Sequence, residues 1–210
     1  PQISPDGKSV VIVVSRPDYD KNRYNPELVL INLASGKKTT LTQNRLAVSS
    51  PRWSPNGEQL AFISKDGESK EAKNQILLLS MPGGEAKQIT KAPKGVQHFA
   101  WSPNSIEIAY ASLNEPKNKA EIEKGFTAFE IANNDMFVGS QPLPAHIWLV
   151  NTSTSENKRL TDGEWTLPLV IPPGAPSSPF SWSPDGKTIL FVKVVSPYSG
   201  DKQFSTIQLL

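Results

Sequence analysis

The sequence has no cysteine, two histidines and no long apolar run. Without thiols the chain forms no disulfide, thiolate nucleophile or cysteine-ligated zinc site. No apolar stretch approaches the roughly 20 residues that cross a bilayer as a helix, and we recognise no signal-peptide pattern in these residues. The 22 Lys and Arg nearly balance the 20 Asp and Glu, and they do not cluster as nucleic-acid binding requires. We therefore expect neither nucleic acid nor membrane as a partner.

Motifs for common catalytic chemistries are also missing from the sequence. It contains no Gly-x-Ser-x-Gly elbow, P-loop, dinucleotide-binding glycine motif or EF-hand spacing. The two histidines, His98 and His146, lie far apart in the sequence, and each falls in a predicted strand. We interpret both as strand residues, and we expect no catalytic residue, no metal and no cofactor in this chain.

One motif occurs four times, at Ile3–Lys8, Trp53–Glu58, Trp101–Ser105 and Trp182–Lys187. Its core is Ser-Pro-Asp/Asn-Gly, a tight turn in which Pro presets φ at the second position and Gly suits the last. In the third copy Ser105 replaces the glycine, so we expect Asn104 to take the left-handed conformation there. Each copy leads into an alternating apolar stretch, as in a strand, and a second apolar strand follows later.

The spacing of the repeat predicts the fold. The motif serines are 50, 48 and 81 residues apart, and propeller blades repeat about every 40 to 50 residues. We predict an all-β chain, a partial β-propeller of four-stranded antiparallel blades within a single domain over 1–210. We expect about three and a half blades of a parent propeller that has about six to eight. The regular repeat favours this fold over a β-sandwich. The predicted blades are approximately 1–42, 49–90, 97–161 and 179–210. The insertion in the third blade is predicted over 113–145.

The long connections all fall on one predicted face. In an up-and-down blade, the links between the second and third strands lie on the same face as the links to the next blade. The long segments are 16–26, 65–74, 113–145, 162–179 and 196–204. Long loops on a rigid scaffold commonly carry binding sites, so we expect binding on this face. Within the insertion we predict a short helix over 119–130.

Candidate binding residues come from the two longest of these loops. The insertion has aromatic side chains that need a partner surface, and the loop over 162–179 contains the only tryptophan outside the predicted strands. The candidates are Phe126, Phe129, Glu130, Asp135 and Trp165. Paired carboxylates would also fit glycosidase chemistry, but we interpret Glu121 and Glu123 as the solvated face of the short helix.

The motif Trp182-Ser183-Pro184-Asp185-Gly186-Lys187 resembles the TolB-like, WD40-like repeat. That repeat is shared by the periplasmic TolB protein and by the propeller of the prolyl oligopeptidase family of serine peptidases, of the dipeptidyl peptidase IV and acylaminoacyl peptidase types. The segments 126–135, 146–150 and 159–161 are similar to bacterial members of the peptidase family, which have an insertion in a middle blade.

The resemblance implies a function for the whole chain. In the peptidase family the propeller caps a C-terminal α/β-hydrolase domain, admits peptide substrate by size and supplies acidic residues for its amino terminus, a role that would fall to Glu130. The expected partners are thus a peptide and a hydrolase domain, with the catalytic triad outside this chain. The alternative is a TolB-like, non-enzymatic protein-binding scaffold. We expect open blade edges to allow self-association, and a periplasmic or secreted rather than cytoplasmic location.

Overall fold

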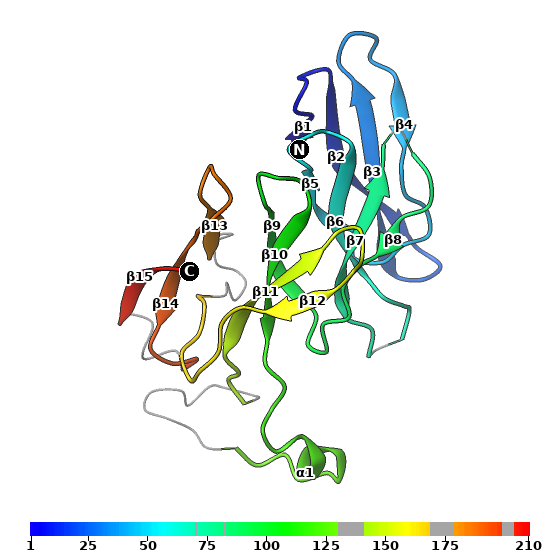
Figure 1. The fold of residues 1–210 in the computed structure, drawn as a ribbon. Coiled ribbons are helices and arrows are strands. Elements are labelled where there is room, and N and C mark those ends of the chain that lie inside the picture. The colour runs from blue at the N-terminus through cyan, green and yellow to red at the C-terminus, as the bar shows by residue number, and fades with distance from the viewer. Residues whose placement is uncertain (70, 82, 130–140, 169–178, 199–203) are drawn as a thin grey trace.

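The computed structural model describes residues 1–69, 71–81, 83–129, 141–168, 179–198 and 204–210. Four antiparallel sheets follow one another along the chain and fan out side by side (Figure 1). The first sheet contains, in spatial order, β1 (Gln2–Ile3), β2 (Ser9–Asp18), β3 (Arg23–Asn32) and β4 (Lys38–Thr40). The second contains β5 (Ser49–Trp53), β6 (Gln59–Lys65), β7 (Asn74–Ser80) and β8 (Lys87–Gln88).

The third and fourth sheets repeat the same up-and-down order. The third contains β9 (Val96–Trp101), β10 (Glu107–Leu113), β11 (Ala145–Asn151) and β12 (Asn157–Arg159). The fourth contains β13 (Phe180–Trp182), β14 (Ile189–Val194) and β15 (Ser205–Leu209). Each sheet begins with one copy of the repeated motif, so the prediction of an all-β chain built from antiparallel sheets is confirmed.

The Ser-Pro-x-Gly turns are closed by their own side chains. Ser54 Oγ accepts the amide of Gln59 at 2.9 Å and donates to Asn56 Oδ1 at 2.7 Å. Gly57 has a φ of 76°, a conformation that glycine adopts without steric cost. In the third copy it is Ser105, with a φ of 61°, that is left-handed, so the prediction for Asn104 was wrong. The fourth turn position fixes this conformation, while Asn104 Oδ1 accepts the amide of Ile106, as Asn56 does for Glu58.

The hydrophobic core lies in the three joints between successive sheets. Phe62 and Leu28 pack in the first joint, Ile108 and Phe99 in the second, and Ile147 and Phe180 in the third. These side chains are at most 3% exposed, and burial of each contributes about 1.5 to 3 kcal/mol. The motif residues Trp53, Trp101 and Trp182 pack at the same joints.

Two local predictions differ from the structure. The helix α1 covers only Lys119–Glu123, because the chain leaves the helix at Gly125, where φ is 94°. The expected loop over 16–26 is a strand hairpin, in which β2 and β3 stay paired from Ser9↔Asn32 to Asp18↔Arg23. Figure 1 shows α1 at the lower end of the molecule and the β1–β2 turn at the upper end.

Candidate functional site

The candidate site is the lower end of the third sheet, where the insertion leaves it. β10 and β11 stay in register up to Leu113↔Ala145, and the insertion starts from that pair. Two contacts connect its first residues to the end of β12 and to the segment that follows it. Arg159 Nη2 donates to Asn114 Oδ1 at 3.0 Å, and the exposed Lys117 Nζ lies 2.7 Å from Glu164 Oε1. The Arg159–Asn114 hydrogen bond holds the base of the insertion against the sheet, whereas the Lys117–Glu164 pair is exposed to solvent.

A cavity of about 450 Å³ opens at this base. Tyr110 and Trp148 line it with rings stacked at 6.4 Å and 19°. The guanidinium of Arg159 lies 5.5 Å from the centre of the Trp148 ring. Lys91 and Glu115 add one charge of each sign to the lining. An aromatic surface beside a few charged groups can hold an apolar side chain while the charges contact polar atoms.

Hydrogen bonds fix the polar groups around the cavity. Burial raises the pKa of Tyr110 to about 12, so its phenol is neutral, and it donates to Asn157 Oδ1 at 2.8 Å. Arg159 Nε donates to Thr161 O at 2.7 Å, and its Nη2 lies 2.7 Å from Asp162 Oδ1. The amide of Gly163 and the guanidinium of Arg159 lower the pKa of Asp162, which therefore stays ionised.

His146 is buried beside this site, and both of its ring nitrogens have hydrogen-bond partners. Its Nε2 lies 3.0 Å from Gly163 O, which can only accept, so Nε2 carries the proton. Its Nδ1 lies 3.2 Å from Thr161 Oγ1. Burial lowers the pKa of His146 and keeps the ring neutral. The burial of His98, with a smaller effect of Arg52, lowers its pKa to about 4. Both histidines are strand residues, as predicted.

Trp165 takes part in packing between sheets. Its ring lies 4.7 Å from that of His146 at 80°, and 5.4 Å from that of Phe191 at 25°. Lys193 Nζ lies 5.5 Å from the centre of the indole ring. The side chain is partly buried against the third joint. Its predicted role in substrate contact stays a prediction, and any such contact would use the part of the ring that is not packed.

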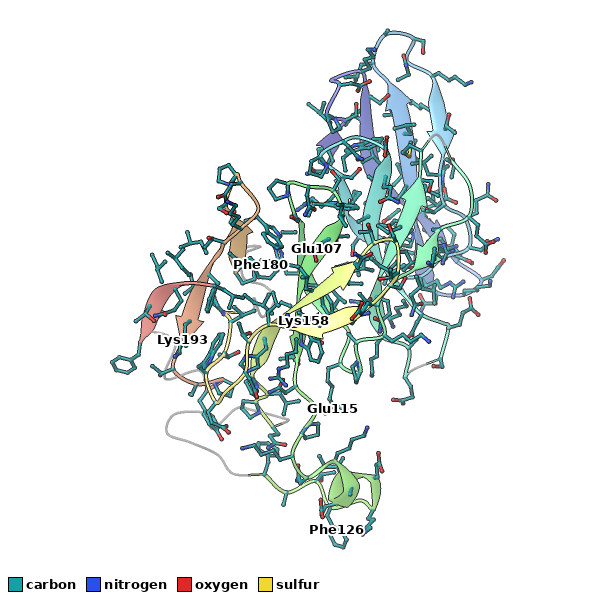
Figure 2. All side chains as sticks on the ribbon, viewed as in Figure 1. Glu107, Glu115, Phe126, Lys158, Phe180 and Lys193 are labelled. Carbon is teal, nitrogen blue, oxygen red and sulfur yellow. The ribbon has the colours of Figure 1, made fainter. Side chains whose placement is uncertain are left out.

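The other candidates lie on the insertion. Phe126 is 67% exposed, and Figure 2 shows it at the lower tip beside α1, away from the sheets. Phe129 is half-buried. Glu130 and Asp135 lie outside the described residues, so their predicted roles stay predictions. The structure places Phe126 apart from Trp165, and these two do not form one site.

Sequence reasoning missed the cavity itself. Tyr110, Trp148 and Arg159, which line it, are not among the candidate residues that the sequence indicated. Trp148 and Arg159 come together because they are paired across β11 and β12. The register of that pairing cannot be read from the sequence alone. Among the residues described, no group of three or more His, Asp or Glu is placed to hold a metal ion.

Comparisons with known proteins point to peptidases. The chain is 35% identical over 69 residues to dipeptidyl-peptidase 5 of Porphyromonas gingivalis, a match covering 33% of this chain and 10% of that protein. It is 32% identical over 72 residues to the uncharacterized peptidase YuxL of Bacillus subtilis, covering 34% and 11%. The matches thus span about a tenth of the length of these relatives. No family model matches the chain.

Solved structures share the fold over most of the chain. An acylaminoacyl peptidase in complex with Z-Gly-Gly-Phe-chloromethyl ketone superposes with a TM-score of 0.64 at 18% identity, covering 97% of this chain and 29% of that one. TolB from Acinetobacter baumannii gives a TM-score of 0.56 at 19% identity, covering 90% and 36%. At these identities the structural matches establish the fold alone. The similarity to peptidases comes from the sequence matches. The chain is therefore similar to the propeller domain of the prolyl oligopeptidase (S9) family of serine peptidases.

Proposed function

We propose that this chain is a non-catalytic part of the propeller of a prolyl oligopeptidase-type serine peptidase. It supplies about three and a half blades of a larger ring. The face that carries its long connections, which we call the loop face, binds or admits peptide substrate for a catalytic α/β-hydrolase domain. The similarity to dipeptidyl-peptidase 5 carries this proposal.

The arrangement of the loop face supports a role in peptide binding. The insertion between β10 and β11 and the cavity at its base lie at the same end of the third sheet. The stacked rings of Tyr110 and Trp148 offer an apolar surface, and Lys91 and Arg159 offer donors to peptide carbonyls. An exposed Phe126 at the tip of the insertion adds an apolar contact for a substrate or for the catalytic domain.

Glu130 is proposed to bind the free amino terminus of the peptide. The test uses the longer protein that joins this chain to a hydrolase domain. A hydrogen bond between charged groups contributes about 1.5 to 3 kcal/mol, so Glu130→Gln should lower kcat/KM about 10- to 150-fold for substrates with a free amino terminus. N-acylated substrates should be unaffected. Glu121→Gln, on the exposed surface of α1, is the matched control. Equal kinetics of the Glu130 variant and the wild type on both substrates would remove Glu130 from the site.

The chain by itself should have no peptidase activity. Both histidines lie in strands, His146 buried and His98 half-buried, and no serine in a nucleophile elbow accompanies them. Incubation of the purified chain with aminoacyl-peptide substrates should release no product by mass spectrometry. Turnover above that of a buffer control would contradict the proposal.

The TolB-like scaffold is the less favoured alternative. TolB shares the fold at under 20% identity, whereas the sequence matches described above are with peptidases. A scaffold would bind a folded protein partner, and Glu130→Gln would not change the processing of any peptide.

A further inference from the structure

In the second sheet a buried glutamine holds the connection that leaves the outer strand. Thr90 Oγ1 accepts the amide of Ile76 at 2.9 Å and donates to Gln75 Oε1 at 2.8 Å. Gln75 Nε2 donates to Ala92 O at 3.0 Å, and Gln75 Oε1 accepts the amide of Ala92 at 2.9 Å. The glutamine therefore ties this connection to β7. We call the arrangement, here Gln75 with Thr90 and Ala92, the clasp.

The third sheet has the same clasp with His146 in place of Gln75. Thr161 Oγ1 accepts the amide of Ile147 at 2.9 Å. His146 Nε2 carries the proton and lies 3.0 Å from Gly163 O, so Nδ1 is left to accept from the Thr161 hydroxyl at 3.2 Å. The two clasp residues also share one register, because each pairs with a serine of the neighbouring strand.

Trp165 rests on the two residues that the third-sheet clasp joins. Its indole lies against Gly163, since a Cβ on that glycine would lie 2.9 Å from Trp165 Cδ1. The ring of His146 meets the indole edge-on at 4.7 Å. The next residue, Thr166, is held independently by its pairing with Val194 of β14. Loss of the clasp would thus free the indole while the connection stays anchored beyond it.

We propose that His146 is a positioning residue: it holds Trp165 in place on the loop face, and uptake of a proton by its ring loosens the clasp. A neutral imidazole donates at one nitrogen and accepts at the other, as the clasp requires, whereas a protonated one can only donate. The threonine hydroxyl then loses its acceptor. Gln75 fills the same place with an amide that does not titrate. The connection after the third sheet is therefore sensitive to pH, and the one after the second sheet is not.

The surroundings of His146 set the direction of this effect. Burial lowers its pKa, and Arg159 of β12 acts the same way. Three weaker influences favour the charged ring: the Gly163 carbonyl, Asp162 and Glu164. Lys193 of β14, labelled in Figure 2, lies 5.5 Å from the centre of the Trp165 indole. Since the pKa in the closed clasp lies below its ordinary value of 6.5, the clasp is fully formed above pH 6.5 and weakens as the pH falls.

Backbone hydrogen exchange followed by NMR tests the proposal in the 210-residue chain. The amides of Ile147 and Ile76 report on the two clasps, and the ratio of their rates cancels the intrinsic pH dependence of exchange. His146→Leu removes the hydrogen bonds of one clasp, so at pH 7 Ile147 should exchange about tenfold faster relative to Ile76. His146→Gln should leave the ratio within about twofold of the wild type. Gln75→Leu is the matched control and should accelerate Ile76 instead.

The pH dependence separates a positioning role from simple packing. Between pH 7 and 5.5 the rate of Ile147 should rise several-fold relative to Ile76, up to the limit of about tenfold that a group of pKa 6.5 in the open state allows. His146→Gln should abolish this rise, and His98→Gln should retain it. In the double variant Gln75→His with His146→Gln, the rise should move to Ile76.

A nuclear Overhauser contact between Gly163 Hα and Trp165 Hδ1 reports directly on the indole. It should be lost in His146→Leu and retained in His146→Gln. A weaker binding of peptide on release of Trp165 is the one consequence that rests on the function proposed above. The NMR measurements need no peptide, so they can fail while that function stands. Retention of the contact in His146→Leu, or a pH-dependent rise at Ile147 that persists in His146→Gln, would overturn the proposal.

Discussion

Replacement of Trp101 by Phe should destabilise the chain more than the same change at Trp148. The indole of Trp101 donates to Arg52 O at 3.1 Å across the second joint, whereas Trp148 Nε1 is buried and has no hydrogen-bond partner among the described residues. Both rings are half-buried and pack against the same cluster, so the loss of ring size is similar in the two variants. The difference between them therefore reports on the indole N–H groups, one hydrogen-bonded and one unpaired, and not on the rings.

The magnitudes can be estimated from these contacts. Trp101→Phe loses a hydrogen bond of about 1 kcal/mol and apolar contacts of about 1 kcal/mol. Trp148→Phe loses the same apolar contacts, but it removes an unpaired buried N–H whose burial costs about 1 kcal/mol or more. We expect the free energy of unfolding to fall by about 2 kcal/mol in Trp101→Phe and to change by less than about 0.5 kcal/mol in Trp148→Phe.

Urea unfolding followed by far-UV circular dichroism measures this difference. With an m-value of about 2 kcal/mol per molar urea, the midpoint of Trp101→Phe should lie about 1 M below that of the wild type, with m unchanged. Phe at position 148 still provides a ring beneath Arg159, so the Trp148 variant keeps that contact. Equal destabilisation of the two variants would refute the assigned role of the indole bond.

Three further predictions concern stability. Ser155 has a φ of 62° and a buried hydroxyl without a partner among the described residues, so Ser155→Gly should raise the free energy of unfolding by about 1 kcal/mol; a thermal melt that shows a loss would contradict this. Burial lowers the pKa of His98 from 6.5 to about 4, so the unfolded chain takes up a proton first and stability should fall from pH 6.5 to 4. His98→Gln should flatten that part of the pH profile, and an unchanged slope would contradict the assignment. Lys117→Ala, which breaks the exposed pair with Glu164, should change the free energy of unfolding by less than about 0.5 kcal/mol, whereas a larger loss in urea would show that this pair holds the insertion.

The fold could be predicted because its signal is local and repeated. The residues of the Ser-Pro-Asp-Gly turn at Ser183 favour a tight turn, and the alternating residues after it favour a strand. The same pattern occurs in all four copies. Local preference alone misled at Ser105, where the turn geometry overrides the residue's avoidance of positive φ. It also misled over 119–130, where Gly125 ends the helix early.

The candidate site was harder to predict because it depends on register between strands and on packing between sheets. The exposed Phe126 was recognised from its place in a long insertion. Trp165 was also recognised as a loop residue, but no sequence pattern indicates that its ring packs against His146 and Phe191. The cavity over Tyr110 and Trp148 requires knowledge of which strand faces which.

The unbroken pairing of β10 with β11 has a consequence for engineering. Because seven consecutive pairs from Glu107↔Asn151 to Leu113↔Ala145 join the two strands, the connection between them is a natural exchange point. The entropy of closing a loop grows only as the logarithm of its length, so segments of very different size can be substituted there while the surrounding sheet keeps its shape.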